Sequence, residues 1–355
     1  MSEPEITCEK AGRCGLITLN RPKALNALTL NMVREMAGAL DRWERDPVVT
    51  RVIVTGAGGK AFCAGGDIRI LYDLGKAGRH AEQFSFWREE YCLNRRIKLY
   101  PKPYVALADG IVMGGGAGIS LHGSHVIAGE HFTFAMPETG IGFFPDVGAT
   151  FFLPRLSGKA GVYLALTGAG MTCGDALAFG VACAHVPSAR HAALVQRLIG
   201  GEDIAATIAA ESAPPPASTL HPQSQSIERC FSGATLPAIL ADVDDASHAG
   251  LDFARSAAHA IRSKSPSSLA IALRQMQIGA KLDIDEALRT EFRIVSRIAR
   301  GHDFYEGVRA VIIDKDNRPL WNPPGIESVE PAGIETYFAP LPEGELDFRA
   351  QGCCP

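Results

Sequence analysis

The sequence predicts an α/β fold followed by a helical carboxyl-terminal region. Short apolar runs alternate with segments of helical periodicity over the first two hundred residues, and Gly and Pro separate them. Later segments carry helical periodicity alone. We therefore expect a core over residues 1–200 and a helical region over residues 201–355, with a Pro- and Ser-rich connector between Ala213 and Ser226.

Apolar runs of strand length mark the predicted strands. The clearest is Tyr104–Ala108, which Pro103 introduces and Asp109-Gly110 ends, as is typical of a strand buried on both faces. The other predicted strands are Gly15–Leu19, Arg51–Thr55, Val126–Ala128 and Phe132–Ala135.

Apolar spacing and capping residues mark the predicted helices of the core. Thr29 is the expected N-cap of a helix whose apolar face carries Met32, Met36, Leu40 and Trp43 at three- and four-residue spacing. The other predicted helices here are Ala81–Ile97, Lys159–Leu166, Ala176–Phe179 with its start at Thr172–Asp175, and Ala189–Leu198.

The carboxyl-terminal region has equally clear helix signals. Ser265 precedes Pro266 in the pattern of a first helical turn, and Gly279 is expected to end that helix. A capping-box pattern of Asp283 with Glu286 predicts the next helix, which we expect to stop at Gly301.

The bulk composition argues against several classes of partner. The 355 residues carry a formal net charge of −4, so no global basic field would hold nucleic acid or an anionic membrane. No apolar run approaches the roughly 20 residues that cross a bilayer. Nine scattered cysteines predict reduced thiols rather than a disulfide framework. Because the first residues lack the apolar stretch of a signal peptide, we expect a cytoplasmic location.

Two glycine-rich segments follow predicted strands and suggest a site for a polarised carbonyl group. Gly65-Gly66 comes after Arg51–Thr55, and Gly114–Gly116 comes after Tyr104–Ala108. Glycine lets a backbone N–H approach a ligand closely, and one N–H from each segment has the composition of an oxyanion hole.

Two acidic residues in apolar loops suggest the accompanying chemistry. Glu138 follows Met-Pro, and Asp146 follows Phe-Phe-Pro. Apolar surroundings raise the proton affinity of a carboxylate, and such a pair beside N–H donors can perform acyl chemistry without serine or cysteine.

Three other kinds of site are disfavoured by the residues. Gly56–Lys60 lacks the Ser or Thr and the first glycine of a phosphate-binding loop. The histidines at 122, 125 and 131 lack cysteine partners and helical zinc-ligand spacing, so no metal site is predicted. Gly118–Gly123 misses the spacing of a serine nucleophile elbow by one residue.

The chain resembles the crotonase (enoyl-CoA hydratase/isomerase) superfamily. The motifs of the superfamily are LNRPKALNAL at Leu19–Leu28, the AGGD segment within Gly56–Ile68, and DGIVMGGG at Asp109–Gly116. The match is closest to the 3-hydroxyisobutyryl-CoA hydrolase branch, in Phe134–Gly148, Phe152–Gly158 and Asp303–Asp316. The resemblance implies a spiral of ββα turns as the core, with helices packed over it or between subunits.

The resemblance also assigns roles to the glycines and acids. It places the oxyanion-hole amides on Gly66 and Gly115. Hydratases of the superfamily use two glutamates; this chain keeps the second as Glu138, but the first falls on Gly118.

Two further acids follow the hydrolase pattern. Asp146, together with Glu90 as a substrate contact, resembles the hydrolase branch, although Glu90 by itself would be expected to be solvated. The implied reaction is hydrolysis of 3-hydroxyisobutyryl-CoA, a step of valine catabolism. Glu138 would act as nucleophile or as general base, and Asp146 would orient and proton-couple its partner.

The expected ligand is a small-molecule acyl-CoA, and coenzyme A is part of the substrate rather than a cofactor. By resemblance, its adenine and pantetheine portions should bind along Lys23, Ala24, Leu25, Ala64, Asp67 and Ile68. A homo-oligomer is possible in this superfamily. Two alternatives stay open: an enoyl-CoA hydratase or isomerase with a divergent substrate, and a non-catalytic acyl-CoA-binding protein.

Overall fold

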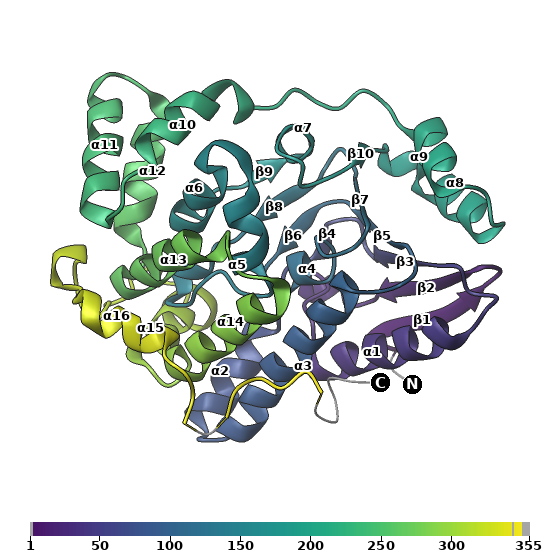
Figure 1. Cartoon of the computed structure of the whole chain (residues 1–355), viewed down its shortest axis with the longest axis horizontal. Coiled ribbons are helices and arrows are strands. Elements are labelled where there is room, and N and C mark those ends of the chain that lie inside the picture. Colours follow the sequence, from purple (N-terminus) through teal and green to yellow (C-terminus); the bar gives the residue numbers. More distant parts are fainter. Residues whose placement is uncertain (1–2, 343, 350–355) are drawn as a thin grey trace.

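Two β-sheets lie at the centre of the computed structural model, and helices cover them (Figure 1). The structure describes residues 3–342 and 344–349. Helices α8 (Ser188–Ile199) and α9 (Ile204–Glu211) lie at one end of the molecule. Helices α10 (Ser224–Cys230), α11 (Leu236–His248) and α12 (Asp252–Ser263) lie at the other, and a long segment connects the two groups (Figure 1).

The larger sheet has six strands in the order β1-β2-β3-β5-β7-β10. Strand β1 runs antiparallel to β2, and the later neighbours pair in parallel. Side chains alternate between two buried faces, as expected for a parallel sheet covered on both sides. The bounds are β1 (Ile6–Ala11), β2 (Cys14–Leu19), β3 (Arg51–Gly56), β5 (Tyr104–Ala108), β7 (His125–Ala128) and β10 (Ala184–His185).

The smaller sheet has four strands in the order β4-β6-β8-β9 and carries the glycine-rich segments. Strands β4, β6 and β8 pair in parallel, whereas β9 is antiparallel to β8. The bounds are β4 (Ala61–Cys63), β6 (Ile111–Met113), β8 (Thr133–Ala135) and β9 (Met171–Thr172). The strand predicted from Phe132 therefore begins one residue later.

The predicted helices of the core are present with small shifts in their bounds. The side chain of Thr29 accepts a hydrogen bond from the N–H of Met32, as expected of an N-cap. The helices of this part are α1 (Leu30–Arg45), α2 (Ile68–Lys76), α3 (His80–Lys98), α4 (Gly115–Gly118), α5 (Ala149–Phe152), α6 (Ala160–Thr167), α7 (Cys173–Ala178), α8 (Ser188–Ile199) and α9 (Ile204–Glu211).

The carboxyl-terminal helices correct two sequence expectations. Ser224–Ser226, assigned to the connector, forms the first turn of α10. Gly301 does not end α14, which stops at Ile298; it is the N-cap of α15. The bounds are α10 (Ser224–Cys230), α11 (Leu236–His248), α12 (Asp252–Ser263), α13 (Pro266–Gly279), α14 (Ile284–Ile298), α15 (His302–Val308) and α16 (Pro331–Phe338).

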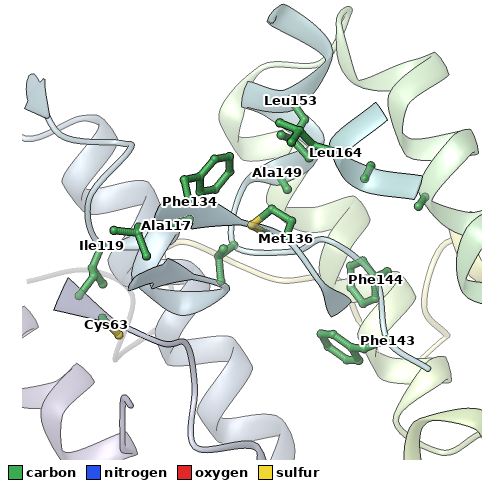
Figure 2. Packing of buried hydrophobic residues seen from close by; sticks show 14 of the residues in the cluster. Cys63, Ala117, Ile119, Phe134, Met136, Phe143, Phe144, Ala149, Leu153 and Leu164 are labelled. Atoms are coloured by element: carbon green, nitrogen blue, oxygen red, sulfur yellow. The ribbon is translucent and has the colours of Figure 1, made fainter. Parts of the chain in front are cut away.

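The hydrophobic core lies on both faces of the larger sheet. One cluster joins the sheet to residues as distant in sequence as Ile6 and Phe348. Figure 2 shows the part of it around Phe134 and Met136, at the end of β8. A second cluster packs the opposite face against Leu194 of α8 and Ile208 of α9. The division of the chain at residue 200 stays a prediction.

Two bulk expectations can be compared with the structure. Among the described residues no helix has both the length and the hydropathy needed to cross a membrane. The described cysteines 8, 14, 63, 173, 183 and 230 are free thiols. Cys92 is disulfide-bonded and is an exception among the described cysteines to the predicted reduced thiols.

A buried carboxylate at the start of α7 anchors the connector. Asp175 is fully buried and completes a capping box with Thr172. Its carboxylate also accepts hydrogen bonds from the N–H groups of Thr219 and Leu220 and from the hydroxyls of Ser218 and Thr219, at 2.6 to 3.1 Å. Burial raises the pKa of Asp175, but these hydrogen bonds outweigh that effect and leave the pKa below its usual value.

We expect Asp175→Asn to lower the free energy of unfolding by roughly 2–4 kcal/mol, because the amide would turn its NH₂ donor toward N–H and hydroxyl donors. The native pKa is depressed, so this stabilisation is complete above the unfolded pKa of about 4 and is lost as pH falls further. Chemical denaturation from pH 3 to pH 7 measures both effects. Asp252→Asn is the control because that side chain is 92% exposed; equal effects of the two changes would contradict the assignment.

Candidate active site

A cavity of about 350 Å³ lies where the smaller sheet meets the carboxyl-terminal helices. It brings together the two glycine-rich segments and the acids that the sequence singled out. Its lining includes Ala64, Gly65, Gly66, Ile68, Leu71, Phe86, Trp87, Glu90, Met113, Gly114, Gly115, Pro137, Glu138, Gly140, Ile141, Phe143, Asp146, Lys264, Val311 and Ile312.

The two glycine-rich segments meet because they follow neighbouring strands. Strands β4 and β6 pair in parallel, so the residues after their carboxyl ends emerge at the same edge of the sheet. The N–H of Gly66 lies 3.2 Å from the position that a Cβ of Gly115 would take. The expected meeting of these two residues is therefore present in the fold.

The backbone of Leu28 directs the N–H of Gly66. Leu28 donates to the carbonyl of Gly65 at 2.8 Å, and its own carbonyl accepts from Asp67 at 2.9 Å. Since successive N–H groups of extended chain point to opposite sides, the N–H of Gly66 points away from the Leu28 backbone. It donates to none of the described residues, so it is free to bind a ligand oxygen.

The second N–H lies at the start of α4. Gly114 has a φ of +46°, a conformation that favours glycine, and it turns the chain from β6 into that helix. Gly115 is the first helical residue, where an N–H has no intrahelical acceptor. A side chain at Gly115 would overlap the carboxylate of Glu90. Backbone and carboxylate thus lie in contact at this edge of the cavity.

The acids lie on three different elements around this point. Glu138 begins a 3₁₀ turn (Glu138–Ile141) after β8, Asp146 lies in the loop before α5, and Glu90 is on α3. Their exposed fractions are 7% for Glu138, 5% for Asp146 and 2% for Glu90. The expectation from the residues alone that Glu90 is solvated is therefore wrong.

Hydrogen bonding distinguishes the three carboxyl groups. The hydroxyl of Tyr91 donates to Asp146 Oδ2 at 2.8 Å. Oε1 of Glu90 and Oε2 of Glu138 are buried without a hydrogen-bond partner among the described residues. Asp146 is thus held in place, whereas one oxygen of each glutamate remains available to a ligand.

Burial and mutual repulsion raise the proton affinity of the cluster. Burial followed by the charge of Asp146 raises the pKa of Glu138 and of Glu90 well above its usual value. Burial raises the pKa of Asp146 to about 7, although the Tyr91 hydroxyl partly opposes this. Since like charges in low dielectric repel, not all of these groups ionise together near neutral pH.

A fourth carboxyl group anchors the loop that carries Asp146. Glu291 of α14 is fully buried and accepts hydrogen bonds from the N–H groups of Gly148 at 2.7 Å and Thr150 at 2.9 Å. The side-chain amide of Gln275 donates to the carbonyl of Pro145 and to the Thr150 hydroxyl. Burial, and next the charge of Asp146, raise the pKa of Glu291 to about 8. The carboxyl-terminal helices thus fix the loop from behind.

The residues expected to bind coenzyme A do not all line the cavity. Ala64 and Ile68 line the cavity. The carbonyl of Leu25 accepts a hydrogen bond from the N–H of Ala64 at 3.0 Å. This contact places the turn that contains Lys23 and Ala24 beside Ala64.

The side chain of Asp67 has a structural use instead. It caps α2 by accepting from Ile70 and pairs with Arg21 at 3.0 Å. A ligand contact at this position is therefore left to the backbone.

Comparison with known proteins identifies the family. A model of the enoyl-CoA hydratase/isomerase family matches residues 14–338. The chain belongs to this family. Among curated proteins it is similar to the mitochondrial 3-hydroxyisobutyryl-CoA hydrolases of Danio rerio (44% identity, 96% of this chain, 91% of the relative) and Homo sapiens (43% identity, 97% and 91%).

Solved structures of the family show the same fold. A carnitinyl-CoA dehydratase from Mycobacterium thermoresistibile has a TM-score of 0.92 at 40% identity, over 98% of this chain and all of that one. An enoyl-CoA hydratase from Rhodobacter sphaeroides has a TM-score of 0.91 at 42% identity, over 97% and 100%. The predicted crotonase-like fold is confirmed. These family names cover different reactions, so the acids of the site must discriminate between them.

Gly118 is the position at which this family member departs from the hydratase pattern. A Cβ there would lie 2.6 Å from Nδ2 of Asn94 and 2.8 Å from Cβ of Val147. Asn94 is fully buried on α3, one turn after Glu90. The space beside α4 that a second glutamate would need is therefore filled by other side chains.

Five residues of the site were not predicted from the sequence: Glu291, Tyr91, Gln275, Asn94 and Lys264. Glu291 did leave a signal in the sequence, because it stands three residues after Leu288 and four before Val295, on the apolar face of its helix. A charged residue at a buried position of an amphipathic helix indicates a polar partner in the interior. Lys264 and Asn94 left no comparable pattern.

We expect Glu291→Gln to lower kcat at least tenfold while changing the affinity for coenzyme A little. Glutamine keeps one acceptor but turns an NH₂ group toward a backbone donor, which costs about 1–3 kcal/mol and releases the loop holding Asp146. Steady-state kinetics and thermal unfolding measure the two effects. Glu286→Gln, exposed on the same helix, is the control; unchanged kcat in the Glu291 variant would show that the clamp has no part in turnover.

Proposed function

We propose that this family member is an acyl-CoA thioester hydrolase that converts 3-hydroxyisobutyryl-CoA and water to 3-hydroxyisobutyrate and CoA, a step of valine catabolism. The observation that carries the proposal is the convergence of Glu138 and Asp146 on two free N–H groups in one buried cavity. The similar hydrolases carry that activity in their names and match this chain over nearly its whole length.

The N–H groups of Gly66 and Gly115 would bind the thioester carbonyl oxygen. Negative charge develops on that oxygen when the carbonyl carbon is attacked, and each well-placed donor contributes about 3–4 kcal/mol to the transition state. Since both donors belong to the backbone at the ends of paired strands, they need no reorganisation during the reaction.

Glu138 would supply the attacking oxygen by one of two routes. Its buried, unpartnered Oε2 attacks the carbonyl to form an anhydride that water then hydrolyses, or it removes a proton from a water that attacks directly. Either route ends with a free carboxylate and a thiol. Asp146, held by the Tyr91 hydroxyl, would transfer the proton that the departing sulfur needs.

Hydration of an enoyl-CoA is the second candidate, because the two solved structures described above are named as a hydratase and a dehydratase. Addition of water across a double bond needs a second acid or base near the α-carbon. The packing of Asn94 and Val147 against Gly118 leaves no room for it at the position that hydratases use. Hydrolysis is therefore favoured.

The remaining assignments are part of the proposal. Coenzyme A would lie along Lys23, Ala24, Leu25, Ala64, Asp67 and Ile68, and the reaction would need no cofactor or metal. We further propose a cytoplasmic location, whereas the names of the similar hydrolases are mitochondrial. We also propose that the protein is a homo-oligomer, and analytical ultracentrifugation measures its mass in solution.

Purified protein should release thiol from 3-hydroxyisobutyryl-CoA faster than from other short acyl-CoA esters. A thiol reagent measures the rate across a panel of esters, and a chelator in a parallel series should leave the rate unchanged. Hydration of an enoyl-CoA without thiol release from any ester would favour the second candidate. Binding of esters without turnover of either kind would indicate a non-catalytic acyl-CoA-binding protein.

Glu138→Gln and Asp146→Asn should each reduce kcat by at least about a hundredfold, and the double variant should cost much less than the two free energies combined. Because burial and the charge of Asp146 raise the pKa of Glu138, activity should rise with pH as Glu138 ionises. Asp146→Asn removes that charge, so the pH at which the residual activity rises should shift to a lower value. Kinetics of the four proteins against pH test this; additive losses would mean that the acids work independently.

A further inference from the structure

Lys264 is fixed beside the turn that carries Glu138. It is the C-cap of α12, where its N–H donates to the carbonyl of Ile261 at 3.1 Å. The next residue, Ser265, donates its N–H to the carbonyl of Thr139 at 3.1 Å and its hydroxyl to Asp303 at 2.6 Å. These three hydrogen bonds fix the backbone of Lys264 against the turn that carries Glu138.

Two glycines make room for the Lys264 side chain. Its Cδ and Nζ lie 3.6 and 3.1 Å from the position that a Cβ of Gly140 would take. Nζ also lies 3.6 Å from the corresponding position at Gly168, the C-cap of α6. A larger residue at Gly140 would crowd the Lys264 side chain, so the glycine leaves space for this lysine.

The ammonium group of Lys264 lines the cavity without a partner. It forms no ion pair or hydrogen bond with the described residues, and it is the lone Lys or Arg among the lining residues. The same lining includes the apolar side chains of Ile141, Phe143 and Ile312. Burial lowers the pKa of Lys264, and the charge of Glu138 opposes that effect. Lys264 is partly buried. An ammonium with unused donors at a cavity wall gains when a ligand supplies an acceptor.

We propose that Lys264 is a specificity-determining residue that donates a hydrogen bond to an oxygen on the acyl group of the substrate, namely its β-hydroxyl. The inference rests on the proposed function, because it assumes an acyl thioester in this cavity. An unsubstituted alkyl group would displace water from the ammonium without supplying an acceptor. A site built around such a donor discriminates against a substrate that lacks the acceptor.

The charges of the cavity favour a hydroxyl over a carboxylate as this acceptor. Glu90, Glu138 and Asp146 line the same space and would repel an anionic acyl group. A neutral hydroxyl accepts from Lys264 without adding a negative charge, and it also donates to a glutamate oxygen. The recognised chemistry is therefore a neutral hydroxyacyl group.

The test compares two esters that differ by one hydroxyl, 3-hydroxyisobutyryl-CoA and isobutyryl-CoA. Wild-type protein should prefer the hydroxylated ester by at least tenfold in kcat/KM. Lys264→Met keeps the apolar stem and should lose about 10- to 100-fold on the hydroxylated ester, but less than threefold on isobutyryl-CoA. Lys264→Gln keeps a neutral donor and should retain part of the preference. Lys281→Met, at an exposed lysine after α13, is the control and should match wild type.

Equal losses on both esters, or an unchanged preference, would overturn the inference. A carboxylated ester such as methylmalonyl-CoA extends the comparison; stronger dependence on Lys264 for that ester would replace the hydroxyl with an anionic group and also contradict it. If wild type releases no thiol, the proposed function fails separately. The affinities of both esters for wild type and Lys264→Met, measured by calorimetry, then decide: a hydroxyl preference lost in the variant supports the inference, and equal affinities refute it.

Discussion

The repulsion among four buried carboxyl groups is the constraint on which the site depends. Glu90, Glu138, Asp146 and Glu291 are all buried, and the charge of Asp146 makes each of the three glutamates more expensive to ionise. The protein tolerates this arrangement through fixed hydrogen bonds: Tyr91 to Asp146, and two backbone N–H groups to Glu291. The outcome is a set of carboxyl groups that share protons near neutral pH, which is the range in which an acid can both accept and release one.

The architecture around this cluster could largely be predicted from the sequence because it follows from local rules. The apolar run of β5 has its predicted bounds, and Thr29 caps α1 as expected. The two glycine segments were expected to act together because each follows a predicted strand, and the family resemblance chose Gly66 and Gly115 within them. The short strands that directly precede them, β4 and β6, were not predicted, and their parallel pairing brings the segments together. Short-range signals of this kind, such as strand length, capping and glycine turns, survive folding because tertiary contacts reinforce them.

Residues that act across long sequence separations could not be predicted in the same way. Glu291 reaches Gly148 across 143 positions, and nothing near either residue specifies that contact. Glu90 was expected to be solvated from its local sequence, because its burial depends on α14 packing against α3. The misassigned Gly301 shows the same limit on a smaller scale: glycine serves either end of a helix, and only the following segment decides which.

The wide separation of the site residues has a consequence for biosynthesis. The strands that present Gly66, Gly115 and Glu138 belong to the first half of the chain, whereas Lys264 and Glu291 arrive with the last helices. The ribosome makes the chain from its amino terminus, so the segments that carry the glycines and Glu138 emerge before the last helices. Until those helices have been made, a nascent chain has neither the ammonium of Lys264 nor the carboxylate that anchors the Asp146 loop. Enzymatic competence is acquired late, so a prematurely terminated chain would hold the oxyanion donors but not the finished pocket.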